Sequence, residues 1–189
     1  RLTTPDGKNY PLVATNIKAT SDADLAIVKF QSPTNYPIAK LGNVETASEG
    51  SVVYVSGFPS ATAAISESIY NFTEGKVTAN ANRPLAGGYS LVYSNNTLPG
   101  MSGGPVFNEA GETIAIHGRG DVKAATETSN INDNIRIKTG FNLGIPTNTF
   151  MRLAGKLGVD FGKEPPMIVA IRTPKPPQAV DFFLIGVDR

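Results

Sequence analysis

The sequence has no cysteine, which excludes disulfide bonds, a thiol nucleophile and zinc held by thiolates. With a single histidine besides, we expect no structural metal site. We also expect no cofactor. No apolar stretch approaches the ~20 residues of a membrane-spanning helix. The formal net charge is +1 and there is no run of Lys or Arg, so the chain lacks the basic face that binds nucleic acid or a membrane surface.

Glycine and proline are frequent, with 19 and 14 among 189 residues, and this favours short strands and turns over long helices. β-Branched and aromatic residues gather in several short runs that are typical of strands. The strands we expect cover residues 10–19, 25–30, 52–58, 89–94, 105–108, 113–118 and 141–145. A hairpin is also expected within residues 65–80, with its turn at Glu74-Gly75. This pattern indicates an all-β barrel or sandwich.

One late segment has a helical pattern. The side chain of Thr147 or Asn148 is suited to cap its first turn, because either can accept a bond from an N–H group there. Three apolar residues then share one face at helical spacing: Phe150, Leu153 and Leu157. Gly158 marks the expected end of this C-terminal helix.

The rest of the chain is less patterned. Residues 121–139 are polar, which indicates a long loop. Residues 163–178 contain five prolines and are interpreted as an extended linker. Residues 179–189 return to an apolar pattern that resembles the first helix of a tetratricopeptide repeat, which would imply a protein partner bound through further repeats. We therefore expect one domain at residues 1–162, then a linker, then the start of a repeat.

The most informative stretch is PGMSGGPVF at residues 99–107. A serine that attacks a carbonyl must be exposed on a tight turn, with backbone N–H groups directed at the developing oxyanion. The stretch resembles the G-x-S-G-G-P nucleophile motif of the chymotrypsin/trypsin-like serine proteases. The resemblance implies that Ser102 is the nucleophile and that the N–H groups of Gly100 and Ser102 form the oxyanion hole. The alternative is a glycine-rich turn with an idle serine.

A second match lies upstream, where Asp24 precedes the apolar run at residues 25–30. In the same family the triad aspartate precedes a strand of this kind, which implies that Asp24 orients the catalytic histidine; Asp22 is the less suitable candidate. The resemblance covers about residues 10 to 160. It implies two packed antiparallel six-stranded β-barrels with a C-terminal helix. The absence of cysteine favours a bacterial member, and the proline-rich linker followed by a repeat-like segment resembles the cyanobacterial type.

The catalytic histidine of this family precedes the aspartate in a T-A-x-H segment, yet only 23 residues precede Asp24 here and none is His. We therefore expect a truncated first barrel, and a chain that is inactive by itself although its parent is a serine endopeptidase. His117 lies fifteen residues after Ser102, where the family places the wall of the specificity pocket, and is not expected to be the base.

The specificity residues resemble those of the bacterial glutamyl endopeptidases. Thr97 stands five residues before the nucleophile, and His117 lies in an Ile-His-Gly segment, which together imply a pocket for an acidic side chain. The neutral Asn96 disfavours Arg or Lys substrates. Gly118 and Arg119 depart from the family's Trp-Gly, and Arg119 either adds positive charge or is simply solvated. A buried His117 that donates to the backbone is the equal alternative.

Two other interpretations remain. Gly100-x-Ser102-x-Gly104 also fits the nucleophile elbow of α/β-hydrolases, but that elbow needs a following helix and a later His, whereas Pro105 and a hairpin follow here. A protease-like module that binds peptides or serves as a scaffold without catalysis stays open. The family resemblance implies a peptide or protein substrate and a periplasmic or secreted location.

Overall fold

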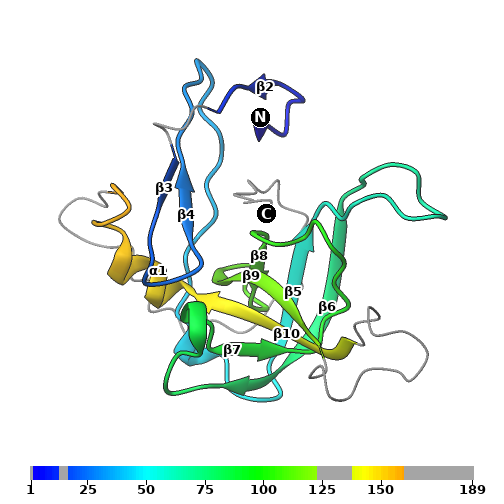
Figure 1. Ribbon diagram of the computed structural model, residues 1–189, viewed down its shortest axis with the longest axis vertical. Helices are drawn as coiled ribbons and strands as arrows, with labels where there is room; N and C mark the ends of the chain where they lie inside the picture. Colours follow the sequence, from blue (N-terminus) through cyan, green and yellow to red (C-terminus); the bar gives the residue numbers. More distant parts are fainter. Residues whose placement is uncertain (1, 13–16, 123–137, 160–189) are drawn as a thin grey trace.

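The computed structural model describes residues 2–12, 17–122 and 138–159, and these are mostly β-structure (Figure 1). The strands are β1 (Leu2–Thr3), β2 (Asn9–Tyr10), β3 (Ile17–Ala19), β4 (Ala26–Val28), β5 (Val52–Gly57), β6 (Asn71–Asn80), β7 (Leu91–Tyr93), β8 (Pro105–Phe107), β9 (Thr113–Val122) and β10 (Lys138–Pro146). One helix, α1 (Thr147–Leu153), and two short 3-10 helices, Val44–Thr46 and Ala86–Gly88, complete the described elements.

Six strands form a closed antiparallel barrel in the order β10-β7-β6-β5-β8-β9. Alternate residues of the strands point inward, so that Val53 and Val55 of β5 are fully buried. They belong to one apolar cluster that fills the barrel: Val44, Ala47, Val53, Val55, Val77, Leu91, Tyr93, Met101, Val106, Ile114 and Ala115. The expected closed barrel with one late helix is therefore confirmed.

The N-terminal strands do not close a second barrel within the described residues. They pair as two separate two-stranded sheets, β1–β2 and β3–β4, and the β3–β4 hairpin stands beside the barrel (Figure 1). The two-barrel architecture thus remains a prediction. A second apolar cluster packs the loop between β3 and β4 against β10 and α1, and consists of Ala23, Leu25, Tyr89, Ile145, Leu153 and Leu157. This cluster fixes the loop that carries Asp24.

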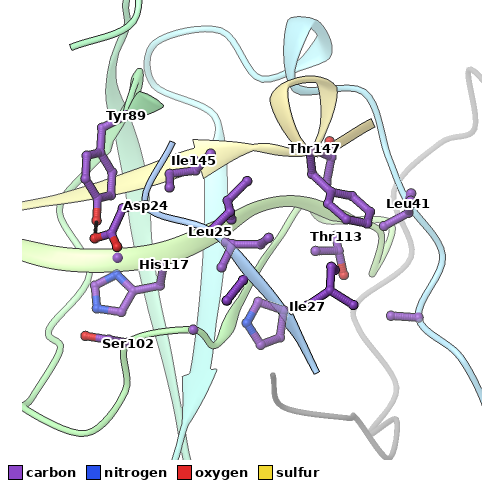
Figure 2. Close-up of a pocket in the computed structure, with 17 residues that line it drawn as sticks. Asp24, Leu25, Ile27, Leu41, Tyr89, Ser102, Thr113, His117, Ile145 and Thr147 are labelled. Atoms are coloured by element: carbon purple, nitrogen blue, oxygen red, sulfur yellow. Dashed lines mark hydrogen bonds between the residues drawn. The ribbon is translucent and has the colours of Figure 1, made fainter. Parts of the chain in front are cut away.

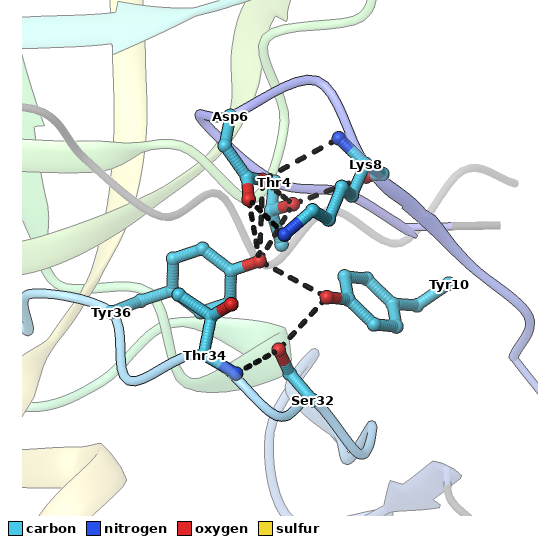
Figure 3. Close-up of polar contacts among 7 residues, drawn as sticks. All are labelled: Thr4, Asp6, Lys8, Tyr10, Ser32, Thr34 and Tyr36. Carbon is cyan, nitrogen blue, oxygen red and sulfur yellow. Dashed lines mark hydrogen bonds and ion pairs between the residues drawn. The ribbon is translucent and has the colours of Figure 1, made fainter.

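A network of polar side chains joins the β1–β2 hairpin to the loop after β4 (Figure 3). Its members are Thr4, Asp6, Lys8, Tyr10, Ser32 and Tyr36. The Tyr36 hydroxyl is 3.2 Å from the Asp6 carboxylate, and Lys8 is 3.0 Å from the same carboxylate. The Thr4 hydroxyl, with smaller help from Lys8, lowers the pKa of Asp6 to about 2.

Several expectations for the local structure were wrong. Glu74-Gly75 is not a turn: β6 runs unbroken from Asn71 to Asn80, pairing first with β5 and then with β7. Gly75 is needed because a Cβ there would overlap the side chain of Asn95 and lie 2.6 Å from its backbone nitrogen. The expected single strand at residues 10–19 contains the end of β2 and all of β3, with residues 11–12 in neither strand.

The helix and the long loop also differ from expectation. Neither Thr147 nor Asn148 caps α1; the N-cap is Pro146, without a side-chain bond, because the Thr147 hydroxyl contacts the Gly42 and Ile114 carbonyls instead. The helix ends at Leu153, earlier than expected. Both ends of the expected loop at 121–139 are strand, in β9 and β10. Residues 123–137, the linker and the repeat-like segment lie outside the described residues. Within the described part, no helix has the length and apolar character to cross a membrane.

Candidate active site

Ser102 is exposed on a turn between β7 and β8, while the preceding Met101 is buried in the barrel. The chain takes this path because Gly100 and Gly103 have φ angles of 94° and 88°, a region that side chains with a Cβ rarely adopt. Gly104 lies so close to the Ser56 carbonyl that a Cβ there would overlap it. The glycines of the motif therefore present the serine hydroxyl outward on a fixed backbone.

The backbone N–H groups of this turn fall into two sets. Three are bonded within the chain: Met101 to the Leu98 carbonyl (3.2 Å), Gly103 to the His117 carbonyl (2.7 Å) and Gly104 to the Met101 carbonyl (3.0 Å). The N–H groups of Gly100 and Ser102 make no such bond to another described residue. Two N–H groups beside the serine hydroxyl are thus available for an anionic oxygen.

Asp24 is exposed at the end of the loop before β4, between the buried Ala23 and Leu25. Its N–H donates to the Gly87 carbonyl at 2.8 Å, and its Oδ2 accepts from the Tyr89 hydroxyl at 2.7 Å. Asp22 points elsewhere, since its carboxylate forms a 2.6 Å ion pair with Lys156 that lowers the pKa of Asp22.

A cavity of about 190 Å³ brings these residues together (Figure 2). Asp24, Ser102, His117 and Gly118 line it. Most of the remaining wall is apolar and includes Leu25 and Ile27 of the β3–β4 hairpin. The cavity thus lies between that hairpin and the closed barrel. Four other candidates from the sequence do not line it: Asn96, Thr97, Gly100 and Arg119.

His117 lies on β9 and is 2% exposed. Its Nδ1 is 2.6 Å from the Tyr93 hydroxyl, so the ring partner is a side chain and not the backbone carbonyl that the alternative interpretation required. Burial, assisted by the charge of Lys138, lowers the pKa of His117 to about 4. The imidazole is therefore neutral at pH 7.

Thr97 is buried beside this site, and its hydroxyl is 2.5 Å from Oδ1 of Asn142. The Asn142 amide nitrogen donates to the Asn95 carbonyl at 2.6 Å, which fixes its orientation and leaves Oδ1 as the acceptor for Thr97. Lys138 donates to the Thr97 carbonyl at 2.8 Å. One cation therefore lies against Thr97 and acts electrostatically on His117.

The other two candidates are exposed. Asn96 points away from the barrel core, and Arg119 lies with its guanidinium 5.0 Å from the centre of the Tyr89 ring. Sequence reasoning missed Tyr89, Tyr93 and Lys138, since each acts through a contact with a residue distant in the chain and has no local motif. In the described part of the chain, no three His, Asp or Glu side chains come together as a metal site would need.

Comparison with known proteins gives two findings. A family model for the trypsin-like peptidase domain matches residues 1–116. The glutamyl endopeptidases of Staphylococcus aureus strains MW2, MSSA476 and NCTC 8325 / PS 47 are each 34% identical to the chain over 143 residues. These matches cover 68% of the chain but only 40% or 39% of each relative. The chain thus spans about two fifths of the length of the curated relatives it matches.

Proposed function

The chain belongs to the trypsin-like peptidase family, and we propose that it forms most of the catalytic domain of a serine endopeptidase whose nucleophile is Ser102. One observation carries the proposal: an exposed serine on a glycine turn, beside two available N–H groups, shares a cavity with the carboxylate of Asp24. These are the parts that acyl transfer needs, apart from a general base.

The chemistry follows from these positions. The Ser102 hydroxyl attacks the substrate carbonyl and gives its proton to a base, and the resulting oxyanion receives hydrogen bonds from the N–H groups of Gly100 and Ser102. The base then protonates the leaving amine, which departs and leaves an acyl-enzyme. Water, activated by the same base, hydrolyses this ester and releases Ser102. Asp24 holds the base in the required tautomer and stabilises its charged form.

We place the general base outside residues 1–189. His117 is the chain's only histidine and lines the same cavity as Ser102 (Figure 2). It is nevertheless unsuited to be the base, because its ring is 2% exposed, its Nδ1 contacts Tyr93, and its pKa is about 4. A base at neutral pH works best with a pKa near 7.

The substrate backbone has a natural place beside the nucleophile. β9 is bonded on its β8 side as far as His117, whose N–H and carbonyl bind Gly104 and Gly103, and from residue 118 to its end it pairs, among described residues, with β10 alone. Its other edge therefore offers backbone groups next to the Ser102 turn. A peptide that adds there as an extra strand would bring its scissile carbonyl towards Ser102.

We further propose that the residue before the cleaved bond is acidic, as the name of the staphylococcal glutamyl endopeptidases suggests for those relatives. Burial holds the pKa of Tyr93 well above its usual value, so its hydroxyl stays protonated. This hydroxyl is 2.6 Å from Nδ1 of His117 and 3.4 Å from the Leu143 carbonyl, and we propose that it donates across the shorter distance, to Nδ1. This assigns the ring proton to Nε2, which can donate to a carboxylate. Because His117 is neutral, the positive charge comes from Lys138, held against Thr97.

Thr97 has a smaller part in this pocket than its position in the sequence implied. Its single hydroxyl proton is engaged by Asn142 and is not available to a substrate unless that bond opens. Its carbonyl instead anchors Lys138. The extracytoplasmic location and a partner bound through repeats at residues 179–189 remain proposals about the whole protein.

The test is covalent labelling with a fluorophosphonate probe, followed by identification of the modified residue by mass spectrometry. We expect the full-length protein to be labelled at Ser102, and the chain of residues 1–189 to react far more slowly, since loss of a triad member costs about 10⁶-fold in rate. Ser102→Ala serves as the control and should abolish labelling. Labelling that survives this substitution would refute the nucleophile, and a full-length protein that is never labelled would favour the non-catalytic module.

A further inference from the structure

We propose that Tyr89 is the positioning residue for the Asp24 carboxylate, an inference that rests on the proposed function. The Tyr89 hydroxyl donates to Oδ2 of Asp24 at 2.7 Å, and Figure 2 shows this contact at the side of the cavity that also holds Ser102. Tyr89 itself is 2% exposed, whereas Asp24 is exposed. A buried, immobile donor therefore holds a carboxylate that stands at the surface.

The Tyr89 ring is fixed on several sides. Gly118 of β9 lies against it, and a Cβ at that position would overlap ring atom Cε1 and the hydroxyl, with Cζ 2.6 Å away. A Cβ at Gly87 would be 3.0 Å from Cε2. The Arg119 guanidinium covers the ring at 5.0 Å, a distance suited to a cation–π contact. Both glycines thus leave the space that this orientation of the ring occupies.

The same segment also holds the backbone of Asp24. The Gly87 carbonyl accepts the Asp24 N–H at 2.8 Å, two residues before the tyrosine that binds the side chain. Main chain and carboxylate are therefore anchored to one short stretch, residues 87–89. Fixing Oδ2 sets the rotation of the carboxylate about its bond to Cβ, which sets the direction in which it meets the imidazole of the base.

This arrangement changes the interpretation of two residues that the sequence assigned to substrate binding. Gly118 is required because Tyr89 occupies the space of its missing side chain. Arg119 is engaged above the Tyr89 ring. Both contribute to the support of Asp24, so substitution of either is expected to alter the rate of the chemical step before it alters the choice of substrate.

The experiment is Tyr89→Phe in the full-length protein, which removes the hydroxyl and keeps the ring. We expect kcat to fall about tenfold, the loss typical of a hydrogen bond to a charged group, with KM and the melting temperature unchanged. Tyr54→Phe is the matched control, because Tyr54 stacks on Phe72 on the barrel and does not line the cavity. It should leave kcat unchanged. A normal kcat in Tyr89→Phe, or a loss explained by a lower melting temperature, would overturn the inference.

A double-mutant cycle separates positioning from a general effect on the fold. If Tyr89 acts only through Asp24, Tyr89→Phe should cause no further loss of the Ser102 labelling rate in an Asp24→Ala background. A second tenfold loss there would refute the assignment. The proposed function fails separately, if Ser102→Ala or Asp24→Ala retains wild-type activity. Normal turnover in Tyr89→Phe together with inactive Ser102→Ala would reject only the inference.

Discussion

The buried His117 should make the stability of the protein depend on pH in a defined window. Its pKa in the folded state is about 4, because burial disfavours the charged imidazole, whereas an exposed histidine has the ordinary value of 6.5. Between these values the unfolded chain binds a proton that the folded chain does not. Acidification therefore favours unfolding, so the contribution of neutral His117 is fully present above pH 6.5 and is lost as the pH falls to about 4.

The size of this effect follows from the same two values. A fall in pKa from 6.5 to about 4 corresponds to roughly 3 kcal/mol of folding free energy. This is a large part of the 5–15 kcal/mol that typical domains possess. The matched variant is His117→Gln, which has no titrating group but can still accept a bond from Tyr93. The stability difference between wild type and variant should shrink by roughly 3 kcal/mol from pH 7 to pH 4.

Two assays check this reasoning on residues 1–189. Urea unfolding followed by circular dichroism gives the free energy of unfolding of each protein at each pH. The contribution of the carboxylates that both proteins share cancels in the difference between wild type and variant. Carbon–proton NMR reports the imidazole directly, because the chain has one histidine and therefore one signal to follow. A midpoint near 6.5, or a stability difference independent of pH, would show that His117 is not buried as described.

Three further predictions concern other parts of the molecule. Lys138→Met should lower kcat/KM about fivefold for substrates with Glu before the cleaved bond, a loss typical of one exposed charge, and should leave kcat/KM for the matching Gln substrates unchanged. Equal losses for both substrates would show that Lys138 does not contribute to the pocket. Gly75→Ala should cost about 1–3 kcal/mol in urea unfolding, since its Cβ would press on Asn95; a neutral result would contradict the packing. Asp6→Asn should make stability less dependent on pH between pH 4 and about 2 than it is in wild type, because the Asp6 side chain stabilises the folded state only while it is ionised. Unfolding that is as acid-sensitive in the variant as in wild type would argue against the network.

The sequence alone was sufficient wherever the information is local. The turn at residues 99–105 is specified by its own glycines, so Ser102 could be named and its exposure anticipated. The short apolar runs identified β4, β5, β7 and β8 within a residue or two, and the family match bears out the protease class. These features depend on backbone conformations and side-chain patterns within a few neighbouring residues.

The tertiary structure decided everything that depends on contacts between distant residues. Gly75 has the residue type of a turn, but it lies inside β6, where Asn95 of the loop between β7 and β8 occupies the space that a side chain would need. Tyr89 meets Asp24 across 65 positions of sequence, and no local pattern encodes that contact. The neutrality of His117 arises from burial and from Lys138 of another strand. Desolvation and long-range contacts are properties of the assembled fold, so a single sequence supplies the groups of this site but not their charge states or orientation.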